Sequence, residues 1–351
     1  MEEYIAFDSH KHYTWVEHQQ ANSGKTRQYR LEHAPGAIRQ ALMGCSPGTP
    51  VAIEATANWY WITDEIEQAR CVPRLVHPRR AKLMMGQINK TDKLDTHGLN
   101  MLQRNGTLPT VWIPPGPLRE LRELTRTRVV LVAQRTRWKN RITATLAKWG
   151  LPASEYSDPY GKGAREELQG RMEQLPEQTR WATQQMLMQL DSLSEQIRQF
   201  EKRLGELVEV TPEMQWLETL PGVGVILSAT IALEIGEIGR FLSAERLASY
   251  SGTVPRVHAS GDRVRYGRTR PDVNRYLKWA FAEAANSTAV NYRRLPDRHV
   301  SQLYARLRAR KGHNKAVGAV ARHLAEAAFH VLSQQQAYRD PTPKAGRTSE
   351  V

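Results

Sequence analysis

Acidic residues stand at the ends of two short apolar runs near the start of this chain, and this placement restricts what the chain can fold into. Asp8 ends the run Tyr4-Ile5-Ala6-Phe7, and Glu54 ends the run Val51-Ala52-Ile53. Short apolar runs of this kind predict buried β-strands. Each carboxylate is therefore expected at the end of a strand, where it borders a site and not the core.

A second acidic pair, Asp92 and Asp95, follows Thr91, which is a good candidate for a helix N-cap. The spacing puts both carboxylates on one face of the first helical turns. The helix dipole favours acids there, and for an isolated pair this is the better interpretation. Together with Asp8 and Glu54, however, the pair predicts one site for a divalent metal ion, Mg²⁺, that supports phosphodiester chemistry.

The first 110 residues alternate between strand-like and helix-like segments. Three strands in a meander come first, and alternating helices and strands follow. This order is typical of a ribonuclease-H-like fold, which gathers acids at the ends of its central strands. The strands are expected at 4–7, 12–18, 26–31, 51–53 and 72–76, and the helices at 37–43, 59–69 and from residue 92 onward.

Two other patterns in this region predict less. His10 and His12 alternate after Asp8 and are interpreted as a polar strand face, in preference to metal ligands. The stretch Gly24-Lys25-Thr26 resembles the end of a phosphate-binding loop. Position 19, where such a loop requires glycine, is Gln19, so that reading is rejected.

The charge of the chain is unevenly distributed. Its 351 residues include 50 Lys and Arg against 36 Asp and Glu, which gives a net charge of +14. Residues 1–110 contribute 13 basic and 11 acidic side chains, so nearly all of the excess lies in the remainder. A near-neutral region followed by a basic one indicates a polyanionic partner, most simply nucleic acid.

Two cysteines, Cys45 and Cys71, are too few for a disulfide framework or a cysteine-rich zinc site, and they fit a reducing cytosol. No apolar run has the length of a membrane span, and Met1-Glu2-Glu3 is acidic where a signal peptide would be basic. We therefore expect a cytoplasmic, nucleoid-associated protein with no membrane partner.

The middle of the chain, residues 111–209, is expected to contain two long helices. Pro114-Pro115-Gly116-Pro117 forms a linker, an arginine-rich helix follows over 118–149, and a loop is expected at 154–163. Apolar residues in the second helix recur in alternating steps of four and three, which is a coiled-coil seam. The pattern favours an oligomer contact and an intrachain partner helix equally. The seam consists of Met186, Leu190, Leu193, Ile197, Phe200, Leu204 and Leu207.

A glycine-rich turn opens the third region. Leu220-Pro221-Gly222-Val223-Gly224 precedes an apolar helix over 225–235, as in a helix-hairpin-helix element. Such a turn lets backbone N–H groups approach a phosphate at a helix N-terminus. Gly222 and Gly224 are therefore predicted to bind nucleic acid, although such a turn also serves as a plain connector between helices.

Ser260 precedes Gly261 and is the serine most densely surrounded by arginine. A serine hydroxyl attacks phosphate well only when its proton is removed and the charge at phosphorus is neutralised. Arginines meet the second requirement, and a nearby metal site would meet the first. The pattern alone also fits a turn serine in a basic hairpin, while Ser243 and Ser251 are interpreted as helix-end residues. The arginines predicted to bind phosphate are Arg256, Arg263, Arg265, Arg268, Arg270 and Arg275.

Together these motifs resemble the RuvC-like DEDD transposases of insertion sequences, the family of the bridge-RNA-guided recombinases and the pilin-gene invertases. The resemblance covers residues 4–335, with Ser251 and Thr96 standing where the family more often has alanine. The N-terminal motifs are Phe7-Asp8-Ser9-His10-Lys11, Ile53-Glu54-Ala55-Thr56 and Lys90-Thr91-Asp92 through Asp95-Thr96. The C-terminal motifs are Leu220-Pro221-Gly222-Val223-Gly224, Glu234-Ile235-Gly236, Phe241, Ser260-Gly261 and Asn274-Arg275-Tyr276-Leu277.

The resemblance implies an α/β plus α architecture. It comprises a ribonuclease-H/RuvC-like domain at 1–110, a helical coiled-coil oligomerisation region at 111–209, a mostly helical transposase domain with a helix-hairpin-helix-like element at 210–335, and a flexible tail at 336–351. The four acids Asp8, Glu54, Asp92 and Asp95 would bind the metal ion. Ser260 would form a phosphoserine link to DNA, and Lys11 is expected to contact nucleic acid.

The implied partners are donor and target DNA and a structured guide RNA, the bridge RNA, whose loops pair with both. Family members act as homo-oligomers, dimers or tetramers, in which domains of different protomers share one site. Two alternatives stay open. One is a DNA invertase or junction-resolving nuclease that works without RNA, and the other is a non-catalytic nucleic-acid-binding protein in which the acids are structural.

Overall fold

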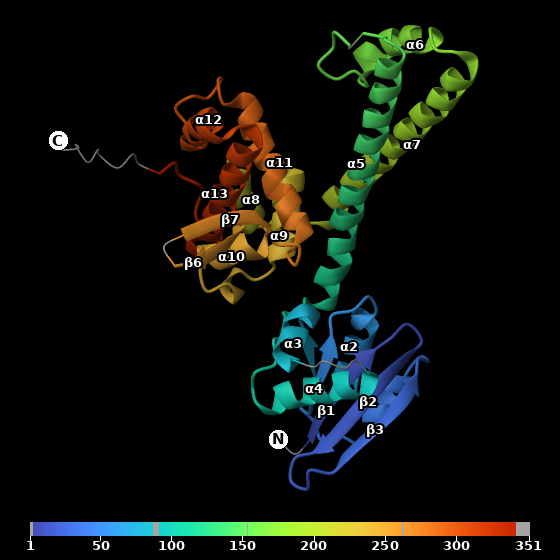
Figure 1. Cartoon of the computed structure of the whole chain (residues 1–351), viewed down its shortest axis with the longest axis vertical. Coiled ribbons are helices and arrows are strands. Elements are labelled where there is room, and N and C mark those ends of the chain that lie inside the picture. The colour runs from blue at the N-terminus through green and yellow to red at the C-terminus, as the bar shows by residue number, and fades with distance from the viewer. Residues whose placement is uncertain (1–2, 87–90, 153, 262, 342–351) are drawn as a thin grey trace, which may run out of the picture. The chain divides into compact units, whose positions relative to one another are not determined.

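The structure, a computed structural model, describes residues 3–86, 91–152, 154–261 and 263–341. The chain divides into two compact units, residues 1–114 and 115–351 (Figure 1). Of the flexible tail expected over 336–351, residues 342–351 lie outside the described residues, as does Lys90. Within the described part, Tyr338 packs against the core of the second unit and donates its backbone N–H to Thr219 Oγ1 at 2.7 Å.

The N-terminal unit is built on a five-stranded mixed sheet in the order β3-β2-β1-β4-β5. β1, β2 and β3 pair antiparallel, as the predicted meander requires, and β4 and β5 extend the sheet in parallel on the other side of β1. The strands are β1 (Glu3–Ser9), β2 (Tyr13–Gln20), β3 (Thr26–Glu32), β4 (Pro50–Glu54) and β5 (Val72–Val76).

The sheet buries a core on each of its faces. Side chains alternate along β1, so Ile5 and Phe7 point to one face and Ala6 to the other. The first face is covered by α1 (Ala37–Leu42) and α2 (Trp59–Gln68), and the second by α3 (Pro78–Met85) and α4 (Asp92–Arg104). Because Ala6 and Ala52 are short, α4 packs closely on β1 and β4.

The second unit begins with a helical hairpin of α5 (Gly116–Lys148) and α7 (Glu177–Leu207), with the short α6 (Arg165–Glu173) at its tip (Figure 1). The predicted seam faces α5 in the same chain: Leu190, Ile197 and Leu204 are only 2–3% exposed. The seam therefore has an intrachain partner, as one of the two interpretations requires. Leu207, at the end of the helix, is exposed.

The remainder of this unit is a helical domain with one β-hairpin. Its core gathers residues from α9, α10, α11 and α13, among them Ile231, Leu247, Phe281 and Leu324, all fully buried. The elements are α8 (Pro212–Glu218), α9 (Val225–Ile235), α10 (Ala244–Tyr250), β6 (Pro255–Ser260), β7 (Arg263–Thr269), α11 (Arg275–Asn291), α12 (His299–Lys311) and α13 (His313–Gln334).

Candidate active-site residues

The ends of β1 and β4 bring two predicted acids to one edge of the sheet. The strands run parallel with Phe7 paired to Ile53, and Asp8 and Glu54 are the next residues on each strand. Asp8 alternates with Ala6, and Glu54 alternates with Ala52. Both carboxylates therefore belong to the sheet face that α4 covers.

The first turn of α4 brings Asp92 to Asp8. Nε2 of His10 lies 3.2 Å from Oδ2 of Asp8 and 3.3 Å from Oδ2 of Asp92. The hydroxyl of Tyr13 donates a hydrogen bond of 3.1 Å to the same Asp92 oxygen, and its ring stacks on His10. One ligand atom from each of Asp8, His10 and Asp92 falls within 4.8 Å of the others, which is close enough to hold one metal ion.

The electrostatics of Asp8 fit a cation at this place. Burial raises the pKa of Asp8 most, His10 opposes that shift, and the carboxylates of Asp92 and Asp95 raise it further by repulsion. A divalent cation among these oxygens would relieve both the desolvation and the repulsion. The donor set of carboxylates with one imidazole suits a divalent ion in general.

His10 was interpreted as part of a polar strand face, and that prediction is wrong. β1 ends at Ser9, so His10 belongs to the following bend and lies between the two acids. Nδ2 of Asn58 fixes this bend by donating to the His10 carbonyl at 2.8 Å and to Ser9 Oγ at 3.0 Å. Lys11 and His12 come next and are exposed.

A buried acid that sequence reasoning missed, Glu17, holds α4 in place. Its side chain is fully buried on β2 and accepts a hydrogen bond from Asn100 at 3.1 Å, with Nδ1 of His97 at 3.3 Å. Thr91 caps the helix, as predicted, by accepting from the backbone N–H of Leu94 at 3.2 Å. These contacts fix the position of Asp92. The available sequence signal was an acid inside a predicted strand, directly after Trp15 and Val16.

Ser260 is the last residue of β6, at the tip of an exposed hairpin. It lies opposite Arg263, and His258 lies opposite Arg265. Since cross-strand partners and alternate residues share a face, Ser260, His258 and both arginines lie on one face of the hairpin. Gly261 takes a φ of +56°, a conformation that favours glycine, so it permits the tight turn after Ser260.

The other predicted arginines differ in their surroundings. Arg256 joins the Ser260 face, because a side chain at Gly267 opposite would touch its Cβ. Arg268 is exposed and alternates onto the opposite face. Arg270 is paired with Asp272, with Nη2 to Oδ2 at 2.5 Å. Arg275 begins α11 and donates to the Tyr276 hydroxyl at 3.1 Å.

The two glycines of the turn between α8 and α9 have different roles. Gly222 has a φ of +79°, and a Cβ there would lie 2.3 Å from the carbonyl oxygen of Ala284 on α11. That contact explains Gly222 as a packing residue. Gly224 is exposed at the N-cap of α9 and has open space where a side chain would be. Only Gly224 keeps the open approach that a phosphate needs.

Glu234 on α9 is fully buried and is the centre of a polar network. Arg126 on α5 binds it with two hydrogen bonds, of 2.6 and 3.0 Å, and Asn274 donates to it at 2.7 Å. Asn274 also caps α11 by accepting from the N–H groups of Tyr276 and Leu277. Two of the C-terminal motifs are thus joined by a structural contact that the sequence did not reveal.

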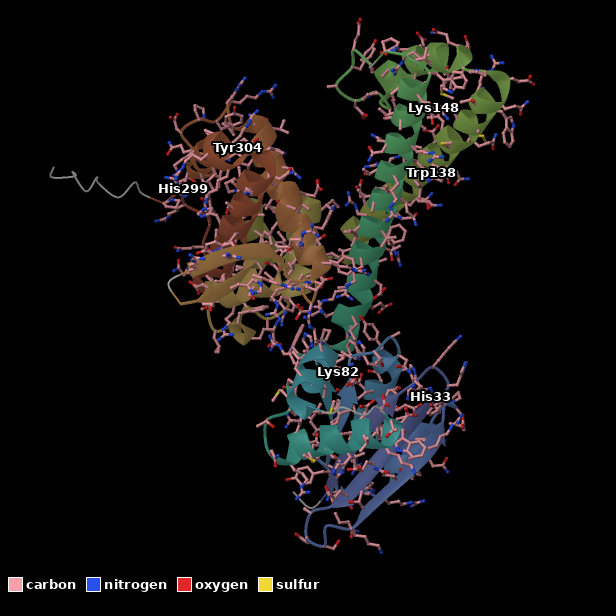
Figure 2. All side chains as sticks on the ribbon, viewed as in Figure 1. His33, Lys82, Trp138, Lys148, His299 and Tyr304 are labelled. Atoms are coloured by element: carbon pink, nitrogen blue, oxygen red, sulfur yellow. The ribbon has the colours of Figure 1, made fainter. Side chains whose placement is uncertain are left out.

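A second basic surface, on α12 and the segments that flank it, was also missed. Between residues 292 and 315 the chain has eight Lys and Arg and one acid, Asp297. Arg293 and Arg308 both donate to the Tyr292 hydroxyl, at 3.0 and 3.1 Å. The hydroxyl of Tyr304, labelled in Figure 2, lies 2.8 Å from Nδ1 of His313 and ties α12 to α13. The exposed basic residues are Arg293, Arg294, Arg298, Arg306, Arg308, Arg310, Lys311 and Lys315.

Comparison with known proteins places the chain in a class of DNA-rearranging enzymes. Residues 5–149 match the DEDD transposase profile of IS110 type, and residues 214–300 match the profile of the transposase IS116/IS110/IS902 family. The chain therefore carries both domains of these transposases. It belongs to the IS110/IS116/IS902 family of insertion-sequence transposases.

Individual relatives agree with the family profiles. The chain is 24% identical to a family 20 transposase of Pseudomonas aeruginosa, over 84% of this chain and 86% of that protein. It is 23% identical to the transposase of insertion element IS1111A from Coxiella burnetii, over 76% and 72%. A shorter match, 38% identical over 72 residues, joins it to the pilin gene-inverting protein of Moraxella lacunata.

Across the described ranges, none of the helices combines the length and apolar character that crossing a membrane requires.

Proposed function

We propose that this protein cuts and rejoins DNA with a Mg²⁺ site in its first unit and a serine nucleophile in its second. The observation that supports the metal site best is the convergence of Asp8 and Asp92 oxygens on Nε2 of His10, at 3.2 and 3.3 Å. Asp8, Asp92, Asp95 and Glu54 are the proposed ligands. When bound, Mg²⁺ would neutralise the phosphate and stabilise the oxygen that leaves phosphorus.

Side chains of the second unit would supply the nucleophile and the positive charge, and further residues would bind the nucleic-acid backbone. Ser260 would attack the phosphodiester: Oγ loses its proton and forms the Oγ–P bond, while the bond from phosphorus to the deoxyribose oxygen breaks and that oxygen takes up a proton to leave as a hydroxyl. Arg263 and Arg265 share its face of the hairpin and would neutralise the charge that develops on the phosphate. Lys11, Gly224, Arg256, Arg268 and the basic face of α12 would hold the nucleic-acid backbone.

The decisive experiment separates catalysis from binding. Asp8→Asn and Asp92→Asn should each abolish Mg²⁺-dependent strand cleavage and leave the affinity for DNA within about twofold, because the surface that binds phosphates is unchanged. His12→Gln is a matched control, since His12 is exposed beside the site. Cleavage at the wild-type rate in both Asp variants would refute the metal-site proposal.

The proposed partners are donor and target DNA, a bridge RNA and further copies of the chain. The net charge of +14 supports a polyanionic partner, most simply nucleic acid. The alternative is a DNA invertase that works without RNA, and the match to a pilin gene-inverting protein supports its DNA-inverting activity. Sequencing the RNA that copurifies with the protein distinguishes them. One discrete RNA encoded beside the gene supports guidance, and full activity after ribonuclease treatment supports the alternative.

A further inference from the structure

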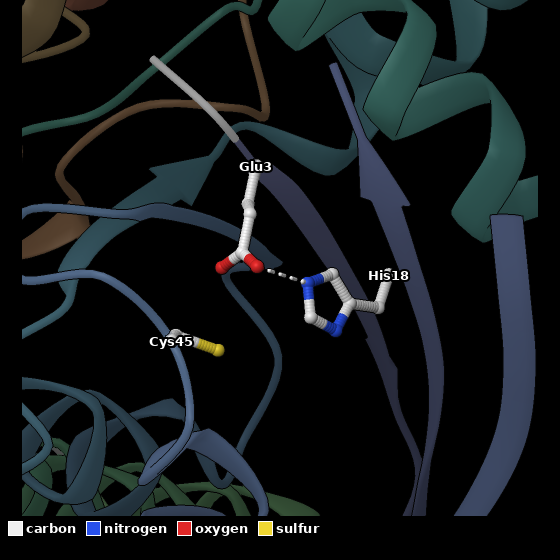
Figure 3. A group of neighbouring side chains, drawn as sticks. All are labelled: Glu3, His18 and Cys45. Atoms are coloured by element: carbon white, nitrogen blue, oxygen red, sulfur yellow. Dashed lines mark ion pairs between the residues drawn. The ribbon is translucent and has the colours of Figure 1, made fainter. Parts of the chain in front are cut away.

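A second group of metal-ligand side chains lies at the other end of the N-terminal sheet. Glu3 begins β1, His18 is near the end of β2, and Cys45 follows α1. One ligand atom from each falls within 4.8 Å of the others. Figure 3 shows the Cys45 sulfur directed toward the Glu3 carboxylate and the His18 ring. This group is separate from the acids at Asp8, because Glu3 and Asp8 are roughly 17 Å apart along the strand.

The strand pairing explains why these side chains meet. His18 pairs with Ile5, and Glu3 pairs with Gln20, so Glu3 and His18 are diagonal neighbours on the face that contains Ile5 and Val16. Beside this pair, the face continues into the apolar core of Ile5, Phe7 and Val16. Cys45 packs against its core, and Cys71, which is 4% exposed, belongs to that core. Polar ligands at the rim of an apolar face are partly shielded from water.

The polar atoms of the group are poorly satisfied by the protein alone. Oε1 of Glu3 and Nε2 of His18 are 3.5 Å apart, which is long for an ion pair with a hydrogen bond. Oε2 of Glu3 and Nε2 of His18 are buried and have no hydrogen-bond partner among the described residues. Unsatisfied buried polar atoms cost free energy, and a bound cation is one way to satisfy them.

The combination of donors identifies the class of ion. We propose that Glu3, His18 and Cys45 bind one zinc-class divalent ion. Sulfur and imidazole donors select Zn²⁺ or Co²⁺ over Mg²⁺, which prefers oxygen alone. Ligand atoms around a tetrahedral zinc ion lie about 3.3–3.8 Å apart, given bonds of about 2.0–2.3 Å. The three ligand atoms lie within 4.8 Å of one another, so shifts of about 1 Å would bring them to the separations found around zinc.

The Cys45 thiol is held protonated in the metal-free protein. Burial raises the pKa of Cys45 to about 12, and Glu3 and the hydrogen bond with the Cys71 thiol act in the same direction. An ion that binds the thiolate must displace this proton. Binding therefore releases one proton from Cys45.

Cobalt titration of the full-length protein tests the proposal. Bound Co²⁺ should give the near-ultraviolet thiolate-to-cobalt charge-transfer band, with one ion per chain. Cys45→Ser should abolish the band. His18→Gln should lower the affinity for Co²⁺ by more than ~10-fold, which is the loss expected for a residue that only contacts a ligand. His12→Gln is the matched control for His18→Gln. Asp8→Asn controls for the other site and should keep the band.

Two results would overturn the proposal. One is wild-type protein that folds, as judged by circular dichroism, and gives no charge-transfer band at millimolar Co²⁺. The other is a band that persists in Cys45→Ser and disappears in Cys71→Ser. In the first case Glu3 and His18 form only an ion pair, and in the second the ion binds elsewhere. Neither outcome depends on DNA cleavage, so the test is independent of the proposed function.

Discussion

Arg126 and Glu234 form a two-point ion pair in which Nε and Nη2 of the guanidinium bind the two oxygens of a fully buried carboxylate, at 2.6 and 3.0 Å. The pair joins α5 to α9. Through Asn274, which donates to the same carboxylate, it also reaches the start of α11. This contact holds the base of the α5–α7 hairpin against the helical domain that carries Ser260.

Removal of the arginine should therefore be costly. Arg126→Met leaves the Glu234 carboxylate buried without its main partner, and we expect a loss of about 3 kcal/mol in the free energy of unfolding, measured with urea. The control is Arg198→Met, because Arg198 pairs with Glu195 on an exposed helix face and should contribute no more than about 0.5 kcal/mol. Equal effects of the two variants would contradict the assignment.

Replacement of Ser260 should separate chemistry from binding and folding. The side chain is exposed at a hairpin tip, so Ser260→Ala should change the free energy of unfolding by less than about 0.5 kcal/mol. We expect normal DNA binding, no recombination and no covalent protein–DNA adduct on denaturing gels. Ser251 is a poor control, because it is fully buried and donates to the Ala248 carbonyl at 2.9 Å.

Ser192→Ala, in an exposed position on α7, is the better control and should keep full activity. An adduct that mass spectrometry maps to Tyr266, which is exposed on the same hairpin, would show that the nucleophile has been misassigned.

The seam of α7 should behave as a core and not as a free surface. Ile197 is 2% exposed, so Ile197→Ala should lower the free energy of unfolding by about 2–4 kcal/mol. Met188→Ala, 63% exposed on the same helix, should leave it nearly unchanged. Sedimentation of both variants then tests the predicted oligomer. Dissociation by Met188→Ala with unchanged stability would assign the contact to the outer face of α7.

Acid should weaken the C-terminal domain through His323. Burial and the nearby His299 lower the pKa of His323 below its usual 6.5, against the weaker opposing effects of Glu326 and Asp340. The folded state then favours the neutral ring, whereas the unfolded chain takes up a proton first as the pH falls. The contribution of the neutral His323 ring to the free energy of unfolding is therefore complete above pH 6.5 and is lost progressively as the pH falls below it.

The melting temperature should report this loss. Between about pH 6.5 and 5 it should fall more steeply for the wild type than for His323→Gln. The variant His12→Gln, whose histidine is exposed in the other unit, should follow the wild-type profile. Parallel profiles for wild type and His323→Gln would contradict the assignment to His323.

Much of the N-terminal sheet could be predicted, because its strands are short apolar runs with polar breaks. Each of the five expected strands is present within a few residues of its predicted bounds. α3 was not predicted, although Pro78 at its first position is a typical helix start. α6 was missed because it is almost wholly polar, and its helical period gives a weak signal.

The candidate site was less predictable, because its geometry depends on tertiary contacts. The sequence pattern predicted Asp8 and Asp92 as metal ligands. It could not show that the bend after Ser9 places His10 between them. From the sequence, Gly222 was predicted to belong to a phosphate-binding turn. Only the approach of Ala284 from a distant helix reveals its packing role. Local patterns contain no information about such partners.

The odd and even positions of β1 have a consequence for how this gene can change. Glu3 and Asp8 are five positions apart, an odd number, so their side chains lie on opposite faces of the sheet. A one-codon insertion or deletion between them would turn both carboxylates toward the same face and leave one group of ligands without its acid. A two-codon change would preserve the faces. Among descendants of this element, length variation within the first strand should therefore be confined to even steps.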